Sequence, residues 1–166
     1  MHNAIPSKIE TFVIQKSILD KTISELQRIG LDNKEGIVYW IGNLNGDVAK
    51  INEAIFAGDY PEFENHQYYA KVPLESSFKI AEKIHQSRKL LFVQVHSHPA
   101  EAFHSPIDNA RPISHRVGLI SLVVPYFGQN VVDLSPCKIY EYEGKGNWHK
   151  ITSPEKEQRF IIEDDD

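Results

Sequence analysis

The segment His96-Ser97-His98-Pro99 carries two imidazoles two residues apart, and Ser105 and Asp108 follow them within a stretch of thirteen residues. Two histidines and one carboxylate, with a fourth position left open, are a typical ligand set of a catalytic zinc ion. The segment therefore predicts a zinc site held by His96, His98 and Asp108.

The residues from Lys89 to His96 form a near-continuous apolar run of strand length, which indicates a buried central strand. Residues two apart in a strand point to the same face, so the imidazoles of His96 and His98 should converge. Pro99 has no N–H to donate and ends the ladder. We expect the pair to lie where the strand opens into a loop, a common place for functional residues.

The segment Ser105-Pro106-Ile107-Asp108 has the pattern of a helix start. Serine suits the N-cap, proline suits the first helical position and an acidic residue suits the third. Ser105 and Asp108 could therefore serve only as helix caps. A helix that begins opposite the end of the histidine strand would also bring the Asp108 carboxylate to the imidazoles, and both interpretations remain open.

The remaining histidines and the single cysteine give weaker signals. Cys137 has no second cysteine, which excludes an intrachain disulfide and a thiolate-rich zinc site. His104 is adjacent to the predicted site, and its spacing does not define a role. The other histidines are isolated, terminal or on a charged face, and we expect surface or structural roles for His2, His66, His85, His115 and His149.

Mixed strand and helix patterns predict an α/β or α+β fold with a mixed central sheet flanked by helices. Asn45-Gly46 is a strong signal for a two-residue hairpin. A single domain over 1–160 and an acidic tail over 161–166 are expected, because there is no repeat or Gly/Ser linker. The expected strands cover 10–14, 35–44, 48–56, 68–72, 89–96, 117–125, 137–143 and 148–152, and the expected helices cover 17–28 and 73–88.

Composition narrows the class of protein. The chain has 166 residues, 41% of them hydrophobic, with a net charge of −5, which is ordinary for a globular protein and unlike the basic footprint of a nucleic-acid binder. The longest apolar runs are too short to span a bilayer, and residues 1–10 lack a secretory signal pattern. We therefore expect a cytoplasmic protein with no nucleic-acid or membrane partner.

With Glu35 added, these residues resemble the JAMM (JAB/MPN+) metalloprotease family, whose pattern is an early glutamate, then H-x-H-P, then S-x-x-D. Glu35 opens an expected strand, as the catalytic glutamate of that family does. The resemblance implies that His96, His98 and Asp108 hold zinc, that Glu35 is the general base, and that Ser105 assists the oxyanion. It also implies a JAB/MPN-like fold over most of the chain.

The form of the loop between Pro99 and Ser105 is similar to bacterial JAB proteins encoded beside ubiquitin-like conjugation enzymes. This resemblance implies hydrolysis of a peptide or isopeptide bond at the C-terminus of a ubiquitin-like protein, with activating and conjugating enzymes of the same operon as further partners. The loop is one residue shorter than in better-known members, so eukaryotic substrates do not transfer. An extended substrate tail would lie against a strand edge, with Tyr39, Trp40, Tyr68 and Tyr69 as candidate lining residues.

Other functions fit the residues less well or share the same site. A metal-free scaffold of this family would lack the ligands that are present here. A zinc deaminase would need H-x-E and P-C-x-x-C, and a thermolysin-like protease would need H-E-x-x-H on a helix. A zinc peptidase that trims a sulfur-carrier precursor would use the same residues on another substrate, and it stays open.

Overall fold

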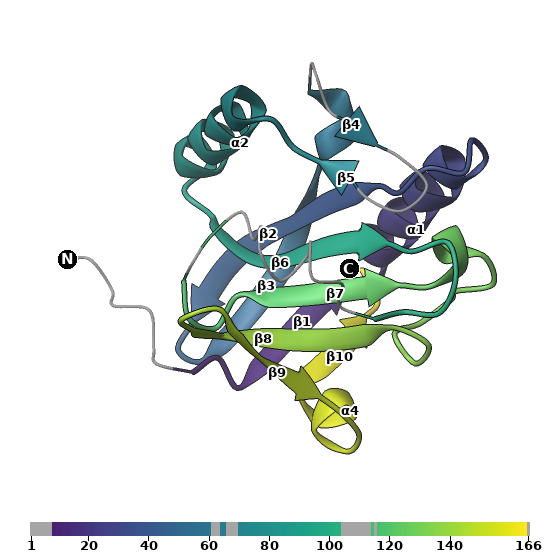
Figure 1. The fold of residues 1–166 in the computed structure, drawn as a ribbon. Coiled ribbons are helices and arrows are strands. Elements are labelled where there is room, and N and C mark those ends of the chain that lie inside the picture. Colours follow the sequence, from purple (N-terminus) through teal and green to yellow (C-terminus); the bar gives the residue numbers. More distant parts are fainter. Residues whose placement is uncertain (1–7, 61–63, 66–69, 104–113, 115, 166) are drawn as a thin grey trace.

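The computed structural model describes residues 8–60, 64–65, 70–103, 114 and 116–165. The fold is α+β, with a curled, mixed sheet of eight strands in the order β10-β1-β3-β2-β6-β7-β8-β9 (Figure 1). A mixed central sheet flanked by helices is the predicted fold class, which is confirmed. The strands of this sheet are β1 (Thr11–Gln15), β2 (Ile37–Asn45), β3 (Val48–Phe56), β6 (Leu90–Ser97), β7 (Ile120–Val124), β8 (Lys138–Gly144), β9 (Asn147–Ile151) and β10 (Phe160–Glu163).

The other described elements surround this sheet. Each helix in the described ranges is too short or too polar to span a bilayer. These elements are the helices α1 (Lys16–Gly30), α2 (Leu74–Ser87) and α4 (Glu155–Arg159), the 3₁₀ turns η1 (Ala57–Asp59) and η2 (Tyr126–Gly128), and the short paired strands β4 (Glu64–Asn65) and β5 (Ala70–Lys71).

The β2–β3 hairpin forms at Asn45-Gly46, where the sequence predicts a two-residue turn. Gly46 has a φ of +63°, a conformation that glycine adopts without steric cost. β2 begins at Ile37 rather than at Glu35. Glu35 and Gly36 are therefore the residues through which the chain enters the strand.

Alternate residues of β2 divide between two buried clusters, one on each face of the sheet. Val38 and Trp40 belong to the larger cluster, together with Leu26 of α1. Tyr39 belongs to the smaller cluster, together with Ile80 of α2. Because neighbouring strand residues point to opposite faces, α1 and α2 cover opposite faces of the sheet.

The proposal that Tyr39 and Trp40 line a substrate groove is wrong. Each is 1% exposed, because β2 is covered on both faces. Trp40 Nε1 donates a hydrogen bond of 2.8 Å to Thr22 Oγ1 within the core, and burial raises the pKa of the Tyr39 hydroxyl above its ordinary value. Tyr68 and Tyr69, the other two candidates, lie outside the described residues.

The C-terminal elements α4 and β10 were not predicted from the sequence. β10 pairs in parallel with β1, and the Phe160 ring stacks on Phe12 with a centroid separation of 4.8 Å. Residues 161–163, which the sequence pattern assigns to an acidic tail, continue this strand. Asp165 accepts a hydrogen bond of 2.9 Å from the Ser17 N–H at the start of α1.

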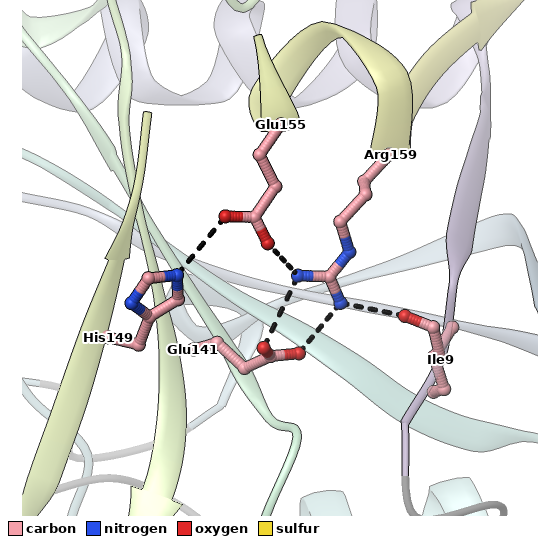
Figure 2. Close-up of polar contacts among 5 residues, drawn as sticks. All are labelled: Ile9, Glu141, His149, Glu155 and Arg159. Carbon is pink, nitrogen blue, oxygen red and sulfur yellow. Dashed lines mark hydrogen bonds and ion pairs between the residues drawn. The ribbon is translucent and has the colours of Figure 1, made fainter. Parts of the chain in front are cut away.

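A buried guanidinium joins these late elements to the rest of the sheet (Figure 2). Arg159 donates to Glu141 of β8 at 2.8 Å, to Glu155 at 3.0 Å and to the Ile9 carbonyl at 2.7 Å. His149 of β9 lies 3.1 Å from the other oxygen of Glu155. The network therefore connects α4 to β8, to β9 and to the chain entering β1.

Candidate metal centre

His96 and His98 lie at the carboxyl end of the central strand β6, separated by its last residue, Ser97. Both histidines are buried, at 4% exposed. His96 is paired with Ile37, a member of the smaller cluster, so its side chain belongs to the face that α2 covers. The two imidazoles converge as expected, with ring centroids 5.1 Å apart and planes inclined by 50°.

This separation fits a shared metal ion. Two imidazoles bound tetrahedrally to one zinc ion, with about 2.0–2.1 Å from the metal to each nitrogen, have ring centres about 5 Å apart. The rings of His96 and His98 meet that requirement at 5.1 Å. Neutral imidazole nitrogens are also among the ligands that zinc prefers. The pair therefore fits two positions of a zinc coordination sphere.

Glu35 precedes β2, the strand that is adjacent to the histidine strand β6. Ile37 is paired with His96 in the antiparallel β2–β6 ladder, and the Ser97 N–H donates to the Gly36 carbonyl at 3.2 Å, which extends the pairing. One further residue along this register places Glu35 opposite His98 on the same face. Glu35 is 3% exposed. Glu35 is thus a buried carboxylic acid just before β2, the strand that pairs with the histidine strand β6.

A second contact fixes this register. The Gly36 N–H donates a hydrogen bond of 2.9 Å to the Ser97 side-chain oxygen, and both residues are buried. Ser97 therefore forms two hydrogen bonds with Gly36: its hydroxyl oxygen accepts one and its backbone N–H donates the other. The sequence analysis assigned it no role, and the signal that could have found it is the hydroxyl between the two histidines.

The remaining predicted site residues cannot be placed. Ser105, Asp108 and the adjacent His104 lie outside the described residues. Among the residues that the structure does describe, no three histidine, cysteine, aspartate or glutamate side chains come together in a way that could hold a metal ion. The roles of Ser105 and Asp108 thus stay predictions from the motif.

Two contacts of His98, one with the Phe103 ring and one with the Phe127 backbone, were not anticipated. The Phe103 ring meets His98 edge to face, with a centroid separation of 4.6 Å and an angle of 84°, and it is 54% exposed. On the other side, the Phe127 N–H donates to the His98 carbonyl at 2.8 Å. Both contacts depend on segments outside the H-x-H-P motif, so the local pattern could not predict them.

Cys137 and His149 lie away from the histidine pair, and His149 takes a structural role, as the sequence predicts. Cys137 is buried, and burial raises the pKa of its thiol to about 12, so it remains protonated at neutral pH. His149 is paired with Glu155 in the network around Arg159. Neither contributes to the histidine pair on β6.

Sequence comparison relates the chain to a probable metalloprotease. No family model matches the chain. The chain is 25% identical over 145 residues to "Probable metalloprotease y4jG" of Sinorhizobium fredii (strain NBRC 101917 / NGR234), with 87% of this chain and 90% of that protein covered. This chain is a homologue of a probable metalloprotease. The relationship is consistent with the JAMM resemblance, and it supports a metal-dependent hydrolase while leaving the identity of the metal open.

Two solved structures align with most of this chain. Protein DSY2949 from Desulfitobacterium hafniense has a TM-score of 0.67 at 12% identity, covering 93% of this chain and 94% of that one. This likeness shows a shared fold. AF2198, a JAB1/MPN domain protein from Archaeoglobus fulgidus, has a TM-score of 0.49 at 17% identity, covering 91% and 98%. That score is below the level at which a shared topology can be inferred.

Proposed function

We propose that this protein is a zinc-dependent hydrolase of the JAMM type, which cleaves a peptide or isopeptide bond at the C-terminus of a ubiquitin-like protein. The observation that carries the proposal is the buried pair His96 and His98, whose ring centroids are 5.1 Å apart. The buried Glu35 lies just before β2, the strand that pairs with the histidine strand. The homologous probable metalloprotease supports the metal-dependent hydrolysis. The ubiquitin-like substrate rests on the motif resemblance.

His96 and His98 would hold the metal, with Asp108 as the third ligand by the motif. When bound, a zinc ion at this position supplies a Lewis acid that acidifies water and polarises a carbonyl group. In this proposal, the end of β6 would hold the two imidazoles and the start of β2 would hold the Glu35 carboxylate, both on the sheet. Such a rigid support is what holds catalytic groups in a productive geometry.

Glu35 is the general base in this mechanism. Its carboxylate takes a proton from the attacking water and later gives it to the leaving amine. Glu35 is only 3% exposed, so few bulk water molecules can reach this carboxylate. Ser105 would donate a hydrogen bond to the developing oxyanion, a contribution of about 3 kcal/mol where such a donor is preorganised.

The substrate and its setting complete the proposal. The C-terminal tail of a ubiquitin-like protein would be held extended at the site and cut from a lysine conjugate or from a precursor. Activating and conjugating enzymes of the same operon are the proposed partners, and the cytoplasm is the proposed location.

The test is cleavage of a fusion between a ubiquitin-like protein and a reporter, with the bound metal measured in the same preparation. We expect about one zinc ion per chain, the ratio expected of a single three-ligand site. Cleavage should stop with a chelator and return with added zinc. Glu35→Gln should keep the zinc and lower the cleavage rate by about 10²- to 10⁴-fold, the usual contribution of a general base. Glu101→Gln, an exposed carboxylate near the same loop, is the matched control and should cleave normally.

The outcomes separate the functions that share this fold. A protein that binds no zinc contradicts the metalloprotease and favours a scaffold. Normal cleavage by the Glu35→Gln variant contradicts the assigned base. Cleavage of a sulfur-carrier precursor without cleavage of any lysine conjugate contradicts the isopeptidase and favours precursor processing.

A further inference from the structure

The turn that follows β7 has an unusual backbone. Tyr126 and Phe127 have φ angles of 52° and 53°, so two consecutive residues with large side chains adopt the left-handed conformation that favours glycine. Such residues persist only where surrounding contacts fix them, and they concentrate at functional sites. The contacts of this turn are therefore of interest for the candidate site.

The turn is bonded to the segment that leaves β6. The His98 N–H donates to the Val124 carbonyl at 2.8 Å, and the Phe127 N–H donates to the His98 carbonyl at 2.8 Å. The Tyr126 N–H donates to the Ala100 carbonyl at 3.0 Å. Both backbone polar groups of His98 are thus fixed by the chain at the end of β7, beyond the last residue of β6.

The turn is held in place by the end of α1. A Cβ atom added to Gly30, the last residue of α1, would lie 2.4 Å from the Phe127 Cβ, so the missing side chain makes room for the Phe127 ring. Beside it, the Gln27 side-chain amide donates to the Gly128 carbonyl at 2.9 Å. Phe127 therefore links α1 to the backbone of His98.

We propose that Phe127, seated against Gly30, is a positioning residue that sets the His98 imidazole for metal binding. This inference rests on the proposed function, in which His98 is a metal ligand. The groups that orient a ligand typically change metal affinity by about 10- to 100-fold when they are lost. Here the orientation would come through the backbone of His98, which carries the ring.

The experiment compares four variants in metal affinity and in backbone protection. Phe127→Ala removes the ring that anchors the turn, and Gly30→Ala pushes on it from α1. Tyr126→Ala is the matched control. Tyr126 has the same left-handed conformation as Phe127, but its side chain is 51% exposed. Phe127→Tyr keeps the ring and should restore wild-type behaviour.

We expect Phe127→Ala and Gly30→Ala to weaken zinc binding by about 10- to 100-fold in a competition titration, and Tyr126→Ala and Phe127→Tyr to bind like the wild type. The visible spectrum of the cobalt-substituted protein should change in the first two variants only. In the metal-free protein, the amides of residues 98 and 127 should exchange faster in those two variants.

Wild-type zinc affinity and an unchanged cobalt spectrum in Phe127→Ala would overturn the inference, even if that variant were less stable. If Gly30→Ala failed to fold, Phe127→Ala and its tyrosine counterpart would still decide. If the wild-type protein bound no zinc, the proposed function would fail. Amide exchange would then test separately whether Phe127 fixes the backbone of His98. Unchanged amide exchange at residues 98 and 127 in Phe127→Ala would show that the Phe127 side chain does not fix the backbone of His98.

Discussion

Ser97 shows how much a single residue between two candidate ligands can decide. It is fully buried, and its hydroxyl accepts the hydrogen bond of the Gly36 N–H next to Glu35. Its own N–H donates to the Gly36 carbonyl. The residue thereby connects the end of β6, which carries the histidines, to the residues that precede β2, among them Glu35.

Ser97→Ala should lower both the stability and the rate of cleavage. The substitution leaves the buried Gly36 N–H without its acceptor, which costs about 1–3 kcal/mol of unfolding free energy. Because the contact positions Glu35, the maximum cleavage rate should fall while zinc binding is kept. Urea unfolding, metal analysis and steady-state kinetics measure these effects. Ser121→Ala, at a buried serine of β7, is the control, and a full cleavage rate in Ser97→Ala would contradict the prediction.

At the scale of elements, ion pairs of Glu155 and Arg159 fix the short helix α4 to the sheet. Burial alone would raise the pKa of Glu155, but the hydrogen bonds from His149 and Arg159 outweigh it and hold that pKa below its ordinary value. The ionised carboxylate is thus favoured in the folded protein (Figure 2). This links the packing of α4 against β8 and β9 to pH.

The sign of the pH dependence follows from that direction. The unfolded chain binds a proton at Glu155 more readily than the folded protein does. The contribution of the ionised Glu155 to the free energy of unfolding is therefore complete above the ordinary glutamate pKa. The contribution is lost as pH falls through the lower folded pKa. Urea unfolding over the acidic range should therefore show a flatter loss of stability in Glu155→Gln than in the wild type. Gln158→Ala on the same helix should keep the wild-type slope, and an equal slope in Glu155→Gln would refute the assignment.

At the scale of the whole molecule, the fold does not depend on the metal for its core. Two hydrophobic clusters cover both faces of the sheet, and His96 and His98 lie at one strand end beside the smaller cluster. A bound ion should therefore stabilise the folded state as a ligand does, by mass action.

Metal removal should consequently abolish cleavage and lower the melting temperature while leaving a cooperative unfolding transition. At free zinc about 100-fold above its dissociation constant, the expected stabilisation is about 2.7 kcal/mol. Calorimetry with and without a chelator, followed by zinc addition, measures it. A metal-free chain that has no melting transition would show instead that the ion is required for folding.

The sequence by itself determined the features that arise from neighbouring residues. The apolar run before His96, the spacing of His96 and His98 and the Asn45-Gly46 turn predicted a buried strand, a converging pair and a hairpin, and all three are present. Each depends on strand alternation or on turn geometry, which act over a few positions along the chain.

Only the tertiary structure decided which distant segments meet. Gly36, next to Glu35, bonds to Ser97 between the two histidines across 61 residues, and β10 forms because it pairs with β1 near the other end of the chain. The burial of Tyr39 and the hold of Phe127 on His98 likewise follow from helices and turns packed onto the sheet. These features need the free energy of long-range packing to offset the entropy of closing long loops, and no local pattern carries that balance.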